Sequence, residues 1–232
     1  MATYNPSKAL LAHRSAGRIK HQRGFSLVSL MIGMTLGLII IATLMGVYNS
    51  TINFSKSMNQ REGARAAVND ALMAIHNQAL QAGYGSSSSI AANLVLIQGA
   101  SVDANGVLSG TAQNTPTSSS SSSASGNAAV WSWLEPTSST TMCQGFAFIG
   151  GQMVKLLPTA CSNASGSWST LQWQTGTLVQ SGLSTSSSVA LSYGNCNSFV
   201  SGSGAMPIMT ITPSYSDGST SIINSTVCMQ NL

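Results

Sequence analysis

The side chains that most often catalyse reactions are scarce in this sequence. Beyond residue 24 the acidic residues are Glu62, Asp70, Asp103, Glu135 and Asp217, and their spacing matches no carboxylate pair used in general acid–base work. Serine is abundant, but no serine stands in a G-x-S-x-G nucleophile elbow. The sequence therefore predicts a protein that is not an enzyme and that uses no cofactor.

Metal-binding side chains are equally dispersed. His13 and His21 lie in the basic N-terminal stretch, whereas His76 lies in a helix predicted further along the chain. The run Asp103-Ala104-Asn105-Gly106 is partly like a calcium loop, yet the later ligands are missing, and a turn is the better assignment. We expect no metal site.

Four cysteines, Cys143, Cys161, Cys196 and Cys228, form an even set in the C-terminal half. Their spacing contains no C-x-x-C pair of the zinc-binding kind, and an even set is typical of disulfides formed in an oxidising compartment. Pairing in sequence order, Cys143 with Cys161 and Cys196 with Cys228, is the first expectation, and the other two connectivities stay open. The cysteines predict a structural role and an extracytoplasmic location.

Charge is rare and unevenly placed. Charged residues make up 6% of the 232 residues, and five of the nine basic ones precede residue 25. The formal charge of +4 thus belongs to the N-terminal stretch, because the rest of the chain carries four basic and five acidic residues. No basic patch for phosphates remains there, so we predict no direct nucleic-acid binding.

An uncharged apolar run over residues 25–47 follows the basic stretch. At about 1.5 Å per residue it is long enough to cross a bilayer core of roughly 30 Å. The basic residues before it predict a cytoplasmic N-terminus and an extracytoplasmic remainder. An ordinary signal peptide fits less well, because the run exceeds a usual h-region and no small-x-small cleavage site ends it.

The apolar run continues into an amphipathic segment, residues 48–85. Val68, Leu72, Ile75 and Ala79 recur at helical spacing, and no proline interrupts residues 25–82. We therefore predict one helix of roughly 87 Å, ended by Gly83 as a left-handed C-cap.

Residues 86–232 predict a Ser-rich β domain. Short apolar stretches alternate there with turn-forming residues and indicate strands at 94–97, 145–149, 153–157, 169–173, 189–193 and 207–212. We expect one antiparallel sheet domain packed on the second half of the helix. The tryptophans Trp131, Trp133, Trp168 and Trp173 are expected to fill its core, and an exposed aromatic binding patch is the alternative.

The most specific pattern lies where the basic stretch meets the apolar run, at residues 23–31, RGFSLVSLM. It resembles the prepilin signature of type IV pilins and type II secretion pseudopilins at Gly24, Phe25 and the apolar positions that follow. The resemblance implies that residues 1–24 are a leader, that a prepilin peptidase cuts between Gly24 and Phe25, and that the Phe25 amine is methylated. It also implies an α+β lollipop, in which a long N-terminal helix packs on a C-terminal antiparallel β-sheet domain.

The sequence departs from this family at Ser29. Most members have Glu at this fifth mature position, where it is thought to neutralise the N-terminal amine of a neighbouring subunit in the filament core. Serine carries no charge and cannot replace it. The departure favours a subunit used rarely over a repetitive major subunit; a tolerated substitution is the alternative.

The residues 79–85, ALQAGYG, and the start of the helix are similar to PilW-type minor pilins. This resemblance implies a subunit that joins other minor and major pilins, primes pilus assembly and lies at or near the tip, in support of motility, adhesion or DNA uptake. The protein would wait in the bacterial inner membrane, as a single-pass subunit near the assembly machinery, before it reaches the pilus and the cell surface. A minor pseudopilin of type II secretion is the nearest alternative, and a membrane-anchored adhesin or binding module is the alternative from another class.

Overall fold

The computed structural model describes residues 26–116, 123–194, 196, 205–216 and 224–232. It forms two compact units, Met1–Phe54 and Ser55–Leu232, which are described separately below. The leader and the predicted Gly24–Phe25 cleavage point lie outside the described residues.

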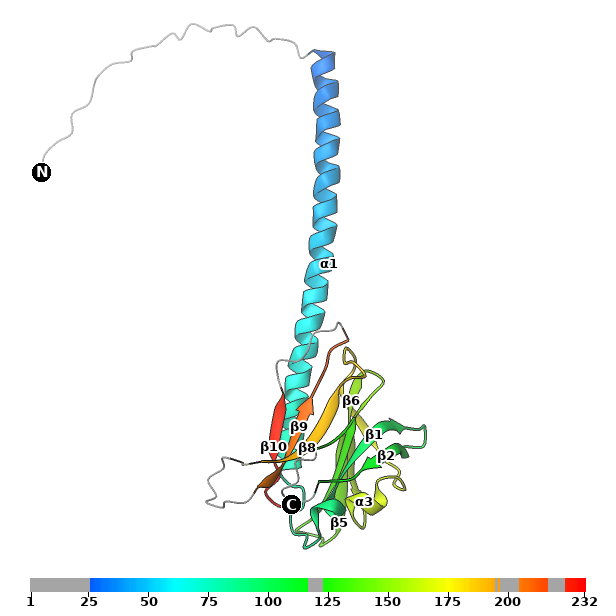
Figure 1. Ribbon diagram of the computed structural model, residues 1–232. Coiled ribbons are helices and arrows are strands. Elements are labelled where there is room, and N and C mark those ends of the chain that lie inside the picture. Colours follow the sequence, from blue (N-terminus) through cyan, green and yellow to red (C-terminus); the bar gives the residue numbers. More distant parts are fainter. Residues whose placement is uncertain (1–25, 117–122, 195, 197–204, 217–223) are drawn as a thin grey trace, which may run out of the picture. The chain divides into compact units, whose positions relative to one another are not determined.

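One long helix, α1 (Leu27–Ala79), opens the described chain, and an antiparallel β domain follows it (Figure 1). This arrangement confirms the α+β fold class. The later elements are α2 (Ile90–Asn93), β1 (Leu94–Val102), β2 (Leu108–Gln113), β3 (Ala124–Gly126), β4 (Ala128–Leu134), β5 (Thr141–Ile149), β6 (Gln152–Ala160), α3 (Ala164–Ser167), β7 (Thr175–Val179), β8 (Ser188–Gly194), β9 (Met206–Thr212) and β10 (Ser225–Cys228).

The first unit consists of the apolar part of α1. The helix is unbroken through Gly46. Three threonines in an otherwise apolar sequence donate their hydroxyls to backbone carbonyls one turn earlier, as Thr35 Oγ1 does to Ile32 O at 3.0 Å, and Thr43 and Thr51 do likewise. These bonds satisfy the hydroxyls within the helix, so the threonines need no polar neighbour.

In the second unit, α1 buries the apolar stripe predicted from the sequence. Val68, Leu72, Ile75 and Ala79 are at most 4% exposed, which confirms that stripe. The helix ends at Ala79, three residues before the predicted end, and a turn follows. Gly83 has φ +78°, the left-handed conformation expected there, but its N–H bonds to Ser132 O at 2.8 Å. A β-strand carbonyl therefore receives the N–H of this glycine.

The antiparallel β domain expected from the sequence contains two antiparallel sheets. The strand orders are β2-β1-β4-β5-β6-β7 and β10-β9-β8-β3. The chain passes from one sheet to the other at Asn127, between β3 and β4. The Asn127 side chain donates to Ala100 O and Phe148 O and accepts from Ala100 N, so it ties this crossing point to β1 and β5 of the six-stranded sheet.

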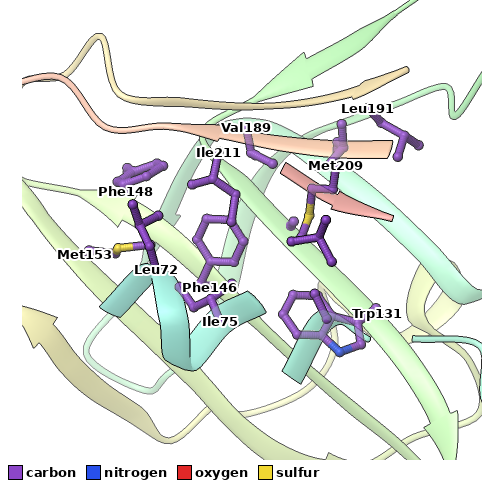
Figure 2. Packing of buried hydrophobic residues seen from close by; sticks show 14 of the residues in the cluster. Leu72, Ile75, Trp131, Phe146, Phe148, Met153, Val189, Leu191, Met209 and Ile211 are labelled. Atoms are coloured by element: carbon purple, nitrogen blue, oxygen red, sulfur yellow. The ribbon is translucent and has the colours of Figure 1, made fainter. Parts of the chain in front are cut away.

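The six-stranded sheet is apolar on both faces. Leu94, Leu96, Ala129, Trp131 and Phe146 belong to one core, which α1 and the four-stranded sheet complete (Figure 2). The alternate positions, among them Val95, Ile97, Val130 and Leu156, belong to a second core that includes Trp173. Successive residues of a strand point to opposite faces of the sheet. Because both faces of this sheet are buried, its strands contain consecutive apolar residues instead of alternating apolar and polar ones.

The predicted strands are correct in five of six places. Residues 94–97, 145–149, 153–157, 189–193 and 207–212 lie in β1, β5, β6, β8 and β9, and each range covers only part of its strand. Residues 169–173 are not a strand. They follow the short helix α3 in hydrogen-bonded turns, since Thr170 N and Leu171 N donate to Ser167 O, and only Gln172 makes a bridge, to Val107.

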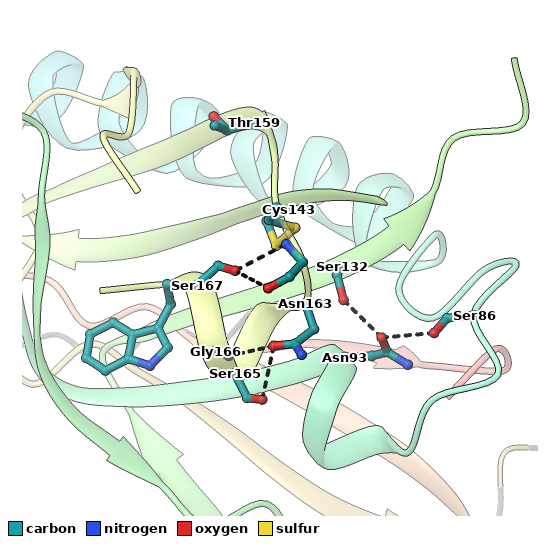
Figure 3. The surroundings of a disulfide bond; sticks show 12 residues. Ser86, Asn93, Ser132, Cys143, Thr159, Asn163, Ser165, Gly166 and Ser167 are labelled. Carbon is teal, nitrogen blue, oxygen red and sulfur yellow. Dashed lines mark hydrogen bonds between the residues drawn. A yellow bond between two sulfur atoms is a disulfide. The ribbon is translucent and has the colours of Figure 1, made fainter. Parts of the chain in front are cut away.

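Two disulfides brace the β domain, in sequence order. Cys143 on β5 bonds to Cys161, which directly follows β6, and Cys196 bonds to Cys228 on β10. Beside the first bond, the Ser162 and Ser167 hydroxyls lie 3.0 Å apart, and Asn163 Oδ1 accepts from Gly166 N to cap α3 (Figure 3). Hydrogen bonds and a covalent link thus fix the same turn.

The buried stripe of α1 predicts that replacing a helix side chain by alanine destabilises the protein only where that side chain is buried. Ile75 is 1% exposed in the core, whereas Met73, on the same helix, is 70% exposed. Ile75→Ala should lower the free energy of unfolding by about 2–5 kcal/mol, because it leaves a cavity. Met73→Ala should change it by less than about 0.5 kcal/mol. Urea unfolding of the full chain in detergent, followed by tryptophan fluorescence, tests this; equal losses for both variants would show that α1 does not form the core.

Candidate membrane-anchoring and assembly segment

The first turn of α1 contains Ser29, the position at which the sequence departs from the prepilin signature. Ser26 precedes the helix, and its carbonyl accepts from Leu30 N at 3.2 Å. Ser29 therefore lies in the first helical turn, and its side chain is exposed. Gly24 and Phe25 lie outside the described residues, so their predicted roles remain predictions.

The apolar side chains of the first unit have no protein core to enter. From Leu27 to Val47 the large ones are between 54% and 75% exposed. Burial of one such side chain is worth about 1.5–3 kcal/mol, so this surface strongly favours apolar surroundings. By length and composition, α1 is able to cross a membrane, a property that signal sequences share. A bilayer or other apolar helices would satisfy this surface.

Two glycines open one side of this helix to close approach. An added Cβ at Gly33 or Gly37 would meet nothing within 4 Å, and the same holds for Gly46. Gly33 and Gly37 are four residues apart, so they lie on one face and expose the backbone there. A second helix can approach this face more closely than a face of larger side chains.

The described part of the chain offers little for metal or acid–base chemistry. Its His, Cys, Asp and Glu residues form no group of three able to hold a metal ion. Asp103 forms the turn expected of it, because its Oδ1 accepts from Asn105 N at 2.9 Å and from Val107 N at 2.8 Å. Burial raises the pKa of the Tyr193 phenol above its usual value of 10.0, which keeps this hydroxyl neutral.

The tryptophans belong to the cores, which agrees with the first interpretation given to them. Trp131 and Trp173 are at most 3% exposed, and Trp133 and Trp168 are partly buried against the same cores. The indole N–H of Trp173 donates to Trp168 O at 2.9 Å. These four side chains pack inside the domain and do not form the exposed aromatic patch that was the alternative.

Residues 19–45 match the prokaryotic N-terminal methylation motif. The match supports a type IV pilin-like protein. It covers the end of the basic stretch, the predicted cleavage point and most of the apolar run. No curated protein and no solved structure matches the chain.

The motif also indicates the class of protein and its general partners. It supports a structural pilin or pseudopilin that a prepilin peptidase processes and that associates with other pilins. Together with the apolar helix, it suits a membrane-anchored subunit that later assembles into a filament.

Sequence analysis missed one feature of the second unit. Arg61 and Arg65 of α1 were not singled out there, but both line a groove of about 670 Å³. Their spacing could have indicated this feature, because residues four apart lie on one helix face and the chain after residue 24 has few other basic residues. The residues across the groove, such as Ser181 and Ser216, are too far away in sequence for any local pattern to reveal.

The open face of the first unit predicts how glycine substitutions act. Gly33→Ile combined with Gly37→Ile should weaken association of the full chain with pilin helices in bilayer nanodiscs by on the order of tenfold, because branched side chains prevent close approach. Gly46→Ile is the control, since it also meets nothing within 4 Å but lies outside the pair. Fluorescence energy transfer between labelled chains measures the association. The same loss for Gly46→Ile would exclude a specific role for the pair.

Proposed function

We propose that this protein is a minor type IV pilin of the PilW type, which primes pilus assembly and lies at or near the pilus tip. The observation that carries the proposal is the methylation motif at residues 19–45, placed directly before an exposed apolar helix and a disulfide-bonded β domain. Through the pilus, the subunit would serve motility, adhesion or DNA uptake.

Processing is the first step of the proposed function. The basic leader, residues 1–24, holds the N-terminus in the cytoplasm, and a membrane prepilin peptidase removes it between Gly24 and Phe25. Methylation of the new Phe25 amine follows. The mature subunit stays in the inner membrane through residues 25–47, with residues 48–85 and the β domain, residues 86–232, on the other side. The oxidising compartment there permits both disulfides.

Ser29 supports a rare position in the filament. When apolar helices pack together, an N-terminal amine loses water and needs a compensating carboxylate, and an unpaired buried charge is costly. Ser29 supplies no charge, and the apolar residues around it supply none either. A subunit of this kind cannot neutralise the amine of its neighbour at every repeat, whereas a position at the end of the filament makes no such demand.

The PilW part of the proposal rests on the resemblance at residues 79–85, and the structure gives Gly83 of this element a local role. Gly83 lies so close to the chain's C-terminus that a Cβ there would come within 2.3 Å of Asn231 O. Asn231 Nδ2 also donates to Leu80 O at 2.9 Å, and Tyr84 O accepts from Leu134 N at 2.8 Å. Glycine at this position therefore allows the helix end, the C-terminus and β4 to meet.

The partners follow from this assignment: other minor and major pilins, the prepilin peptidase and the inner-membrane assembly machinery. Quantitative mass spectrometry of sheared filaments and of membranes tests the proposal, with cells that lack the prepilin peptidase as the control. The proposal predicts the subunit in the sheared fraction at a small share of the major pilin. Recovery only with a type II secretion pseudopilus would indicate a minor pseudopilin, and a chain that stays in the membrane and binds glycans would indicate an anchored adhesin. Either result would contradict the proposal.

The role of Ser29 gives a second test. Ser29→Glu should increase the amount of this subunit in sheared filaments severalfold, because the new carboxylate can pair with the amine of a neighbour. Ser26→Glu is the matched control, since it adds the same charge three residues earlier and should not increase incorporation. The measurement is the ratio of this subunit to the major pilin. An unchanged ratio for Ser29→Glu would show that Ser29 does not limit incorporation.

A further inference from the structure

A groove of about 670 Å³ crosses the second unit beside α1. The helix contributes Ser57, Gln60, Arg61 and Arg65 to one wall, and the segment after β7 and the residues after β9 contribute the opposite wall, including Ser181 and Ser216. Hydroxyl and amide groups thus stand around two guanidinium groups. This combination suits an anionic ligand that accepts several hydrogen bonds.

The groove concentrates the positive charge of the mature chain. After residue 24 the cations are Lys56, Arg61, Arg65 and Lys155, and two of these four line the groove. None of the described residues that line it is acidic. Arg65 Nη1 lies 3.4 Å from Glu62 Oε1, with the two side chains 49% and 63% exposed. Such an exposed pair is weak, so Arg65 is able to exchange this contact for a ligand.

The position of the groove in the sequence indicates which anion it meets. Residues 26–55 carry no charge, and Lys56 is the first charged residue after them. As a helix, these residues span about 45 Å, the thickness of a bilayer including its headgroups. In the sequence, the basic turns of α1 therefore follow the membrane-spanning length directly.

We propose that the groove binds the phosphodiester of an anionic phospholipid at the outer surface of the membrane. This proposal rests on the proposed function, because it requires the subunit to wait in a bilayer. Arg61 and Arg65 hold the phosphate oxygens with their guanidinium groups, and the neighbouring hydroxyls add hydrogen bonds. Ala64, Ala67 and Leu178, which also line the groove, contact the glycerol and the upper part of an acyl chain. The bound lipid would fix the second unit of the unassembled subunit against the membrane.

Native mass spectrometry of the full chain, released from nanodiscs of phosphatidylglycerol and phosphatidylcholine, tests this site. The expected result is one retained phosphatidylglycerol per chain, with phosphatidylcholine retained at least tenfold less. Arg61→Gln combined with Arg65→Gln should reduce this retention at least tenfold. Lys56→Gln combined with Lys155→Gln is the matched control, because it removes the same charge outside the groove and should retain the lipid. Circular dichroism and thermal unfolding of each variant show whether it is folded.

Several results would overturn the proposal. Equal losses of phosphatidylglycerol retention in the two double variants would show a general attraction between charges and no specific site. Equal retention of phosphatidylglycerol and phosphatidylcholine would exclude recognition of an anionic headgroup. Displacement of the lipid by millimolar inorganic phosphate would show a site for free phosphate. The Arg61→Gln, Arg65→Gln variant could also retain lipid normally but be less abundant in sheared filaments. This result would show that the groove binds a neighbouring subunit instead of a lipid. Lipid retention is independent of pilus incorporation, so normal filament recovery without lipid binding would refute this proposal alone.

Discussion

The apolar surface of the first half of α1 is the constraint on which the other features of this protein depend. Its large side chains from Leu27 to Val47 are more than half exposed, and their burial is worth a large free energy that the chain does not obtain by folding alone. A bilayer would satisfy this surface before assembly, and the apolar helices of other subunits would satisfy it in a filament. The motif at residues 19–45 suits both environments, because it covers the end of the basic stretch and most of the apolar run.

The second unit is built to be stable without help from that surface. Its six-stranded sheet buries apolar residues on both faces, and α1 covers one face with Val68, Leu72 and Ile75. Two disulfides add to this stability, as expected for a domain outside the cytoplasm. Few charges are needed for such a fold, and Ser, Thr and Asn keep its surface hydrated.

The sequence predicted the features that depend on local pattern. The stripe at Val68, Leu72, Ile75 and Ala79 has a helical period and lies in the core as expected. The positive φ of Gly83 was also predicted, because glycine after a helical stripe favours the left-handed conformation. The apolar run of residues 25–47 was clear from length and the absence of charge alone.

The features that depend on distant contacts were not predictable in this way. Residues 169–173 have the composition of a strand, but Trp173 enters the second core from a turn whose hydrogen bonds go to Ser167 and Trp168. The crossing from one sheet to the other lies at Asn127, whose side chain bonds to Ala100 and Phe148, 27 and 21 residues away. The groove beside Arg61 and Arg65 brings together segments more than 100 residues apart.

The mass of the mature N-terminal peptide tests the central claim most directly. Membranes from cells with and without a prepilin peptidase would be digested and the N-terminal peptides identified by mass spectrometry. The account predicts a chain that begins with N-methylated Phe25 when the peptidase is present and a chain that retains residues 1–24 when it is absent. A chain that keeps its leader beside an active peptidase, or one cut after residue 47, would contradict the account.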